Sequence, residues 1–468
     1  MNNGQRYVFW MLLLGIIGVL ASGYQIFAQV PNTTGLTIRQ AVEGAVKNYP
    51  SITVSQEQIN AAASGIDLAR TAYLPRVDAL AQINRATRNN VFGLLLPQGV
   101  IPSISGPVIG SNNFGTVWGS AVGGLVTWEP FDFGLRGANL AAATASKLRA
   151  QATLKRTEFE VSVATADAYL TVAAAQETVR AAQAGVDRSG VLLRSVRALT
   201  DAQLRPGADA SRAEAELAAA RTQLAQAQQA VDVSRTVLAQ FVGLPPQQLA
   251  LAAPRLSQLP SDQAAPNFDA AQNPVETEQN AVVELEKAQL NALEKSYVPR
   301  FYAQGSAYAR GTGAELNGGR LGGLNGLAPD TQNYALGLSI TFPVFDFASL
   351  RAREAEQAAT IRSETARSRQ ISTELTAQWN AAVASLSGAR SVAVNTPIQV
   401  TSADAAVRQA TARYQSGLGT IVEVADAQRL LTQAEIDDAL ARLSVWRALL
   451  RIAAAAGNIE PFLTNASQ

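Results

Sequence analysis

The sequence lacks cysteine and histidine altogether over its 468 residues. These two absences exclude disulfide bonds, thiol chemistry, metal sites built from Cys or His, and any nucleophile that a histidine would activate. An enzyme would have to work with carboxylate, lysine or tyrosine groups alone. We therefore expect no enzymatic activity, no metal site and no cofactor.

Charged and aromatic residues are also scarce. Charged residues make up 16% of the chain, the formal net charge is +1, and no block of basic residues occurs. This balance argues against a nucleic-acid partner. Aromatic residues make up only 6%, and alanine is abundant, so the composition favours long packed helices over a thick globular core.

The first residues are typical of an export signal. Arg6 precedes an apolar run at residues 7–20, which is short for a membrane span but suits the hydrophobic region of a signal peptide. Small residues follow, so we predict a signal peptide at 1–28, cleaved after Ala28 or, less favourably, after Gly23. A membrane anchor is the alternative interpretation.

The rest of the chain contains one unit twice. The segment Tyr73-Leu74-Pro75-Arg76 recurs as Tyr297-Val298-Pro299-Arg300, a shift of 224 (297 minus 73). Further on, Phe131-Asp132-Phe133 recurs as Phe345-Asp346-Phe347, a shift of 214 (345 minus 131). We therefore predict two repeats, at 29–247 and 275–468, with a linker at 248–274 between them.

Each repeat contains two segments in which apolar and polar residues alternate, which predicts strands at about 77–88, 116–129, 300–310 and 333–343. Trp118 and Trp128 share one face of the second strand. Ten residues span about 33 Å along a strand, or about 25 Å in height at the usual barrel tilt, which is the height of the apolar band of an outer-membrane barrel. With Phe342 they form a predicted aromatic girdle. Two hairpins cannot close a sheet alone, so we expect other chains to cover its edges.

The remaining segments have helical patterns. We predict one helix from Thr37, its N-cap, to about Tyr73, and a helix of roughly 65 residues after Gly134, which at about 1.5 Å per residue would be roughly 100 Å long. The helices that follow the long ones carry a heptad seam of alternating large and small residues, which Asp438 interrupts. The seam consists of Leu217, Ala220, Leu224, Ala227, Val231, Ser234, Leu238 and Phe241, and of Leu431, Ala434, Ala441, Val445, Ala448, Ile452 and Ala455.

The stretch from Arg413 to Leu431 is predicted to be a tight turn between two long helices. Gly417 supplies the conformational freedom that a reversal needs. Glu423 and Asp426 are three residues apart, so both carboxylates lie on one face of the outgoing helix. At the shift of 214, Asp209 corresponds to Glu423, while Gln203 corresponds to Gly417 (417 minus 203), which predicts a less regular first turn. Each acid alone is equally well explained as a stabilising charge at a helix N-terminus.

The order helix, strand, strand, helix, turn, helix, occurring twice, resembles the TolC-type outer-membrane efflux proteins. Three motifs carry the resemblance: the Tyr-x-Pro-Arg helix end, the Phe-Asp-Phe strand exit and the Arg-Tyr-x-x-Gly-x-x-Thr-x-x-Glu-x-x-Asp-Ala turn. The resemblance implies a mostly α fold with membrane β structure. Three subunits would form one twelve-stranded barrel, continued by a long helical tunnel across the periplasm.

The resemblance also implies a place and partners. The place is the outer membrane of a Gram-negative-type bacterium, with the tunnel extending into the periplasm. The partners are two further copies of the chain, outer-membrane lipid, a periplasmic adaptor protein and an inner-membrane transporter.

Carried over to this sequence, the resemblance implies a periplasmic gate formed by Asp209, Tyr414, Glu423 and Asp426. Three subunits would gather up to nine carboxylates (three each) near one axis, which favours cations. The sequence departs from the family at Gly419, where an arginine would bridge the closed helices. Either Arg205 or Arg212 substitutes for that arginine, or the resting mouth is looser. The turns would contact the adaptor through Gln203, Leu204, Arg205, Pro206, Gly207, Gly417, Leu418, Gly419 and Thr420.

The function that follows is a passive exit duct for small molecules delivered by an inner-membrane pump. One alternative is an exit duct for type I protein secretion. Another, of a different class, is a trimeric coiled-coil stalk with a structural or adhesive role. No role is assigned to the apolar residues Phe92 and Leu94 to Leu96 in the loop between the first two strands.

Overall fold

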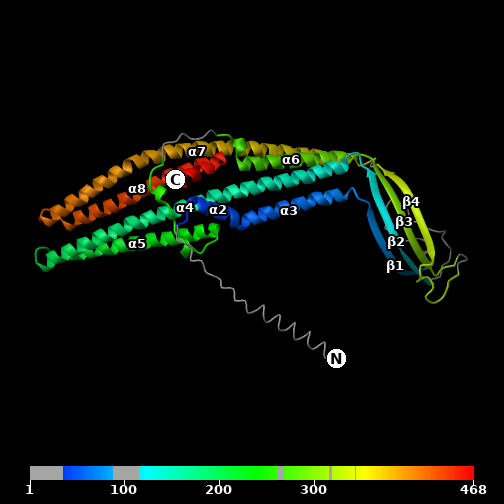
Figure 1. Cartoon of the computed structure of the whole chain (residues 1–468), viewed down its shortest axis with the longest axis horizontal. Helices are drawn as coiled ribbons and strands as arrows, with labels where there is room; N and C mark the ends of the chain where they lie inside the picture. The colour runs from blue at the N-terminus through cyan, green and yellow to red at the C-terminus, as the bar shows by residue number, and fades with distance from the viewer. Residues whose placement is uncertain (1–34, 88–114, 261–267, 316–318, 343, 468) are drawn as a thin grey trace, which may run out of the picture.

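The computed structural model describes residues 35–87, 115–260, 268–315, 319–342 and 344–467. The predicted signal peptide and the apolar loop residues around Phe92 lie outside the described residues. The described part is an elongated body of long helices lying side by side, with one small sheet at its end (Figure 1). No helix in that part combines the length and the hydropathy needed to span a bilayer.

The sheet has four antiparallel strands in the order β1-β2-β3-β4. Their bounds lie close to the four alternating segments of the sequence: Arg76–Thr87 (β1), Thr116–Phe131 (β2), Arg300–Thr312 (β3) and Thr331–Thr341 (β4). The central pair, β2 and β3, joins the two repeats, and Val126 pairs with Gly305 there. The sheet is therefore one unit to which each repeat contributes a hairpin, with β1 and β4 at its edges.

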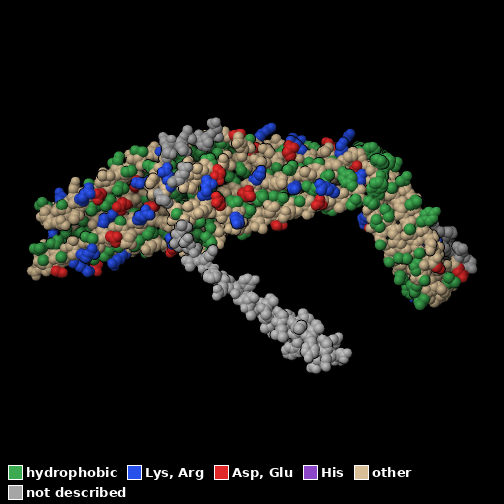
Figure 2. Space-filling model, in the orientation of Figure 1, with side chains coloured by type: hydrophobic (Ala, Val, Ile, Leu, Met, Phe, Trp, Pro, Cys, Tyr) green, Lys and Arg blue, Asp and Glu red, His purple; other side chains and the backbone are tan. Residues whose placement is uncertain are grey.

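One face of the sheet is apolar and exposed, and the space-filling view shows hydrophobic side chains along the strands, with charged ones near their ends (Figure 2). Register places Val77 opposite Val126, and Gly305 opposite Leu336. Leu336 and Leu338 on β4 are 82% and 87% exposed. The other face carries polar side chains such as Gln304, Ser306 and Ser339. An apolar face of this kind is stable in water only if something covers it.

The helix predicted from Thr37 to Tyr73 is in fact two helices, α2 (Ile38–Asn48) and α3 (Pro50–Thr71). The single-helix prediction was wrong because Pro50 forces the residue before it, Tyr49, into an extended conformation. Pro50 then starts the next helix, where its missing N–H costs nothing. Thr37 is the N-cap as predicted, in a capping box with Gln40.

The long helices form a layer in which α4 packs against α5 and α8, and α7 packs against α8 and α6. Near the middle of the body, α3 continues the line of α5, and α6 continues that of α8 (Figure 1). α7 runs on through Pro397 without a break. The bounds are Leu135–Asp201 (α4), Gly207–Val242 (α5), Pro274–Lys295 (α6), Phe347–Gln415 (α7), Ile421–Ala456 (α8) and Glu460–Ser467 (α9).

The predicted heptad seams are largely buried. Leu217, Val231 and Leu238 of α5 are buried, and so are Val445 and Ile452 of α8. Asp438, which interrupts the second seam, accepts a hydrogen bond of 2.8 Å from the Thr396 hydroxyl and forms an ion pair with Arg442. The polar residue therefore has partners of its own within the α7–α8 seam.

The largest core lies midway along the body, where α2, α9 and residues 244–260 pack against α4 and α8. Tyr169 and Trp446 are fully buried there. The Tyr169 hydroxyl donates to the Leu36 carbonyl at 2.8 Å, and Trp446 Nε1 donates to the Gln258 carbonyl at 3.0 Å. Residues 244–260 of the segment between the repeats are thereby fastened to the helices. The described part of that segment contains three short 3-10 helices, Pro246–Gln248 (η2), Pro254–Ser257 (η3) and Ala270–Gln272 (η4).

Candidate functional site

The two helical hairpins, α4–α5 and α7–α8, turn at the same end of the body (Figure 1). Both turns close with the same pair of hydrogen bonds. Leu204 N donates to Leu199 O at 2.9 Å and Gln203 N to Thr200 O at 3.0 Å; the equivalent bonds run from Leu418 N to Arg413 O at 2.9 Å and from Gly417 N to Tyr414 O at 3.1 Å. Nested bonds of this kind define a Schellman motif.

The prediction of a less regular first turn was therefore wrong. Gln203 adopts φ of 60°, where Gly417 has 82°. A residue with a Cβ is strained in this left-handed region by roughly 1–2 kcal/mol. The turn geometry is kept in both repeats, and the first repeat carries a local strain that glycine removes from the second.

The residues predicted to contact an adaptor protrude unequally. Leu204 is 70% exposed, and Leu418, its equivalent at the shift of 214, is 75% exposed. Gly419 is buried, and Arg205 is half-buried. The other predicted residues of this set, Gln203, Pro206, Gly207, Gly417 and Thr420, are exposed. Each turn thus presents an exposed leucine at its tip; that an adaptor binds there stays a prediction.

Tyr414 lies where the two hairpins meet, and only 2% of it is exposed. Its hydroxyl donates to Asp209 Oδ2 at 3.0 Å. The Arg205 guanidinium lies 4.4 Å from the centre of the Tyr414 ring and donates to the Tyr414 carbonyl. Asp209 and Arg205 belong to the first repeat and Tyr414 to the second. These three residues, here called the latch, connect the repeats at their turn end.

The electrostatics of the latch keep the tyrosine protonated. Burial raises the pKa of Tyr414 to about 12, and the hydrogen bond to the Asp209 carboxylate acts in the same direction. A neutral hydroxyl can donate to the carboxylate at every physiological pH. The latch is therefore a permanent connection as long as the hairpins stay in place.

An apolar cluster supports the latch from inside. Leu192, Val196 and Leu217 of the first repeat pack with Tyr414 and Val424 of the second. Burial of such side chains contributes roughly 1.5–3 kcal/mol each. The two hairpins are therefore joined by an apolar contact, and the latch fixes its register.

Glu423 and Asp426 lie beside the latch without contacting it. Thr420 caps α8 by accepting a hydrogen bond from Glu423 N at 3.3 Å. The Glu423 carboxylate lies 3.7 Å from Arg413 Nε, and Asp426 forms an ion pair with Arg429. Both acids are exposed, on one side of α8. An arginine therefore lies beside each acid, and Arg429 also lies 3.7 Å from Glu216 of the first repeat.

The arginine that the family resemblance leads one to expect at Gly419 has an equivalent in the first repeat. Arg205 stands 214 residues earlier (419 minus 205) and reaches across to Tyr414. Arg212, the other candidate, pairs with Glu216 at 3.1 Å. A Cβ at Gly419 would lie 3.1 Å from Arg413 Cβ. In this chain Arg205, in the first turn, is therefore the arginine that reaches from one turn to Tyr414 of the other hairpin.

Two site residues were missed in the sequence, Arg413 and Arg429. Their signals are local: Arg413 directly precedes Tyr414, and Arg429 follows Asp426 by three residues, the spacing of an ion pair on a helix. The charge of a helical acid is best judged together with such neighbours.

The predicted aromatic girdle lies on the sheet. The Arg85 guanidinium is 5.3 Å from the Trp118 ring centre. At the opposite end of β2, Trp128 Nε1 donates to the Tyr73 carbonyl at 3.2 Å. Phe342 meets the Tyr297 ring edge-on, with ring centres 6.0 Å apart. Trp128 and Phe342 are both partly exposed where helices give way to strands, and their contact with lipid stays a prediction.

Solved structures with the same fold are outer-membrane channels. The channel OprN is 20% identical, with 90% of each chain covered and a TM-score of 0.69. MtrE of Neisseria gonorrhoeae, solved in an open state, is 19% identical over 92% of this chain and 90% of its own, with a TM-score of 0.70. VceC of Vibrio cholerae is 16% identical over 90% and 96%, with a TM-score of 0.69. At these identities the likeness establishes the fold alone. No curated protein sequence matches the chain.

The family comparison goes further. The family described as "Outer membrane efflux protein" matches residues 41–244 and 270–458, most of the chain and both repeats. Its members are transport ducts, so the expectation that the chain is not an enzyme is confirmed. The chain belongs to the outer membrane efflux protein family, whose members lie in the outer membrane and extend into the periplasm.

Proposed function

We propose that the chain is the passive outer-membrane exit duct of a tripartite efflux system for small molecules, closed at its periplasmic end by the latch. The observation that carries the proposal is the contact of Arg205 and Asp209 with Tyr414 across the two repeats. A tube made of hairpins can open if the hairpins move apart at their turn end. A connection between hairpins at that end can therefore hold the tube shut.

Three copies of the chain would complete the duct. The strands β1 and β4 leave unpaired edges, and the apolar face of the sheet is exposed at Leu336 and Leu338. Edges and apolar faces of this kind are stable when other strands and lipid cover them. Three sheets of four strands give the expected barrel of twelve.

The energy for transport would come from an inner-membrane transporter, with a periplasmic adaptor holding the two together. The chain offers the adaptor two equivalent apolar tips, Leu204 and Leu418. A partner with apolar pockets would bury both at once. Such a partner could shift the hairpins by binding the open arrangement better than the closed one.

Opening would require the latch to break, which a conductance experiment tests. The variant Tyr414→Phe removes the hydroxyl that donates to Asp209, and Arg205→Ala removes the cation over the ring. A hydrogen bond to a charged group is worth about 1.5 kcal/mol or more, so each variant should raise the ratio of open to closed channels roughly tenfold in planar bilayers.

The matched control is Arg408→Ala. Arg408 is an exposed arginine on α7, six residues before Tyr414 (414 minus 408), and among the described residues its ion-pair partner is Asp404 on its own helix. This variant should leave conductance unchanged. If the double variant Tyr414→Phe/Arg205→Ala conducts as the unaltered protein does, the latch is not the gate.

Small-molecule efflux and type I protein secretion use the same kind of duct. A deletion strain separates them: accumulation of small toxic compounds supports the proposal, while loss of a secreted polypeptide with unchanged accumulation supports the alternative. The stalk without flux has lost its basis, because the family consists of channels.

A further inference from the structure

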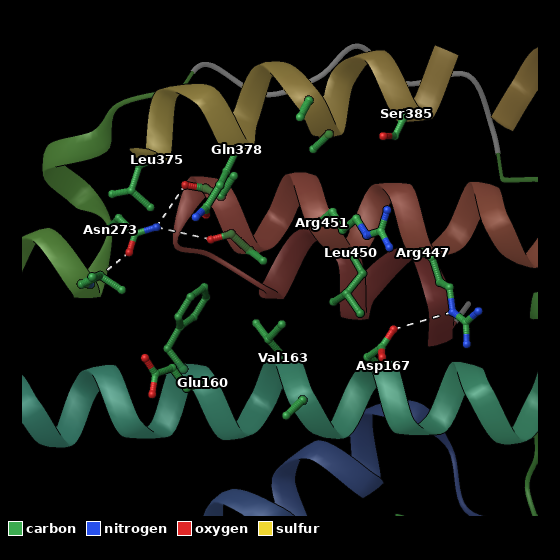
Figure 3. Close-up of a pocket in the computed structure, with 17 residues that line it drawn as sticks. Glu160, Val163, Asp167, Asn273, Leu375, Gln378, Ser385, Arg447, Leu450 and Arg451 are labelled. Carbon is green, nitrogen blue, oxygen red and sulfur yellow. Dashed lines mark hydrogen bonds and ion pairs between the residues drawn. The ribbon is translucent and has the colours of Figure 1, made fainter. Parts of the chain in front are cut away.

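A cavity of about 680 Å³ lies midway along the helical body, where α8 ends and α6 begins. Its walls are α4 and α7, and α8 forms its floor (Figure 3). Val163, Leu375 and Leu450 line it with apolar side chains, while Ala382 and Ala454 leave the space open. This size, and an apolar lining with a few polar groups, are typical of sites for small organic ligands.

Two arginines, Arg447 and Arg451, lie at one side of this cavity, one helical turn apart on α8 (Figure 3). Arg447 Nη2 donates to the Thr171 hydroxyl at 2.7 Å. Its Nε is buried without a hydrogen-bond partner, and the nearest carboxylate oxygen, on Asp167, is 3.6 Å away. Arg447 therefore forms an ion pair with Asp167, and its Nε makes no hydrogen bond.

Arg451 is exposed, and in the described part of the chain it makes no hydrogen bond and no ion pair. Glu160, the other acid of the cavity, is held by Arg156 at 2.7 Å and does not neutralise Arg451. Like charges four residues apart on a helix repel each other. An anion placed beside the Arg451 guanidinium would relieve this repulsion and give Arg451 a partner.

The cavity opens on the same side of α8 as the acids near the latch. Arg447 follows Asp426 by 21 residues (447 minus 426), and Arg451 follows Glu423 by 28 (451 minus 423). Both separations are multiples of seven, and residues seven apart share a face in a coiled coil. At about 1.5 Å per residue, the cavity lies roughly 30–40 Å from those acids along the helix.

We propose that this cavity is a binding site for amphipathic organic anions. A carboxylate or sulfonate would take up the guanidinium groups of Arg451 and Arg447, which pair with planar oxyanions in a bidentate manner. The apolar body of the ligand would pack against Val163, Leu375 and Leu450. That the site lies in the path of transport rests on the proposed function, since that function places this side of α8 toward the lumen. The binding itself does not rest on it.

The test uses the full-length protein in lipid nanodiscs and two fluorescent probes of the same apolar body. Pyrene-1-butyrate carries a carboxylate and 1-pyrenebutylamine carries an ammonium group. Fluorescence anisotropy should show that the unaltered protein binds the carboxylate at least tenfold more tightly. Arg451→Ala should weaken binding of the carboxylate at least tenfold. Arg451→Lys should weaken it less, because lysine keeps the positive charge but cannot bind an oxyanion through two N–H groups at once.

The matched control is Arg362→Ala, at an exposed arginine of α7 outside the cavity; its affinity should equal that of the unaltered protein. Equal binding of the two probes, equal binding by the Arg451→Ala variant, or no binding at all, as when a neighbouring copy fills the cavity, would each overturn the site. Bilayer conductance separates this outcome from the proposed function. A protein that conducts but shows no charge preference loses only the site, and one that binds selectively but never conducts loses only the duct.

Discussion

In each repeat the start of one helix meets the end of another: α3 meets α5 in the first repeat, and α6 meets α8 in the second (Figure 1). We call these two junctions splices, and different contacts hold them. In the first repeat, Tyr49 precedes α3 and packs on Phe241 near the end of α5, with ring centres 5.2 Å apart. In the second, Asn273 precedes α6, and its amide donates to the carbonyls of Ala454 and Ala455 at the end of α8, at 3.3 and 3.0 Å. A shared geometry therefore does not require shared contacts.

The second splice is the tighter of the two. Asn273 is fully buried, and its Oδ1 also accepts from Val275 N at 3.0 Å. One side chain thus caps the end of one helix and the start of the next. At the first splice the Tyr49 side chain makes no cap hydrogen bond within the part of the chain that the structure describes, and the aromatic pair is only half-buried. We expect the second repeat to tolerate less change at this point.

The largest effect on stability should come from the glycines that end α5 in the first repeat and α8 in the second. Gly243 and Gly457 have nearly the same φ, 74° and 76°. A Cβ at Gly457 would lie 2.6 Å from Asn273 Cα, whereas one at Gly243 meets nothing within 4 Å. Gly457→Ala should therefore destabilise the protein by about 3 kcal/mol, and Gly243→Ala by about 1 kcal/mol, because only the first adds a clash to the backbone strain. Thermal unfolding of both variants measures the difference; equal losses would show that the splices are equally open.

Substitutions of the two splice side chains, Asn273 and Tyr49, should have the next largest effect on stability. Asn273→Ala takes away the amide donor of the Ala455 carbonyl and the acceptor of Val275 N, which should cost about 2–3 kcal/mol, while the Ala454 carbonyl keeps its bond from Gly457 N. Tyr49→Leu removes only the aromatic pairing and should cost about 1 kcal/mol. Tyr49→Phe keeps the ring that packs on Phe241 and serves as the control. A larger loss for Tyr49→Leu than for Asn273→Ala in denaturant unfolding would reverse the comparison.

The turns offer a smaller contrast. Gly417→Ala should destabilise by about 1 kcal/mol, since φ there is 82°. Gln203→Gly should stabilise the first turn by less than about 1 kcal/mol, because the relief of strain is partly offset by the freer unfolded chain. The same unfolding measurement serves both variants, and a destabilised Gln203→Gly would mean that the glutamine side chain has a role of its own.

The smallest effect concerns pH. The pKa of Tyr414 is raised to about 12 in the folded protein from an ordinary value of 10.0. The unfolded chain therefore releases this proton first, and the stability contributed by the latch is complete below pH 10 and declines between about pH 10 and 12. Absorbance titration at the tyrosinate band, with Tyr414→Phe as the reference, isolates this residue. Ionisation at the ordinary pKa would show that the hydroxyl is not held by Asp209.

Much of the fold could be predicted because its signals are periodic. Alternation located the four strands, and heptads located the buried side of α5 and α8. The break at Tyr49 also had a signal, since Pro50 and Pro274 correspond at the shift of 224, and both begin helices. Reading Pro50 as a helix start would have separated α2 from α3.

The site was less predictable, because its contacts join residues far apart in the sequence. Tyr414 and Asp209 are separated by 205 residues, and their meeting depends on how the two hairpins dock. From the sequence, Arg205 was one of two candidates, with Arg212, to replace the arginine that is absent at Gly419. Duplication gives the alignment of the turns, but the direction in which a long arginine side chain reaches is decided by the packing around it.

Pro397 has a mechanical consequence for the latch. A proline inside a helix has no N–H for the carbonyl four residues earlier, here that of Ala393, so α7 resists bending least at this point. The 17 residues from Pro397 to Tyr414 (414 minus 397) form an arm of roughly 25 Å. A bend of about 10° at Pro397 would move the end of this arm by roughly 4 Å. That is enough to carry the Tyr414 ring out of reach of the Asp209 carboxylate while the part of α7 before Pro397 stays still.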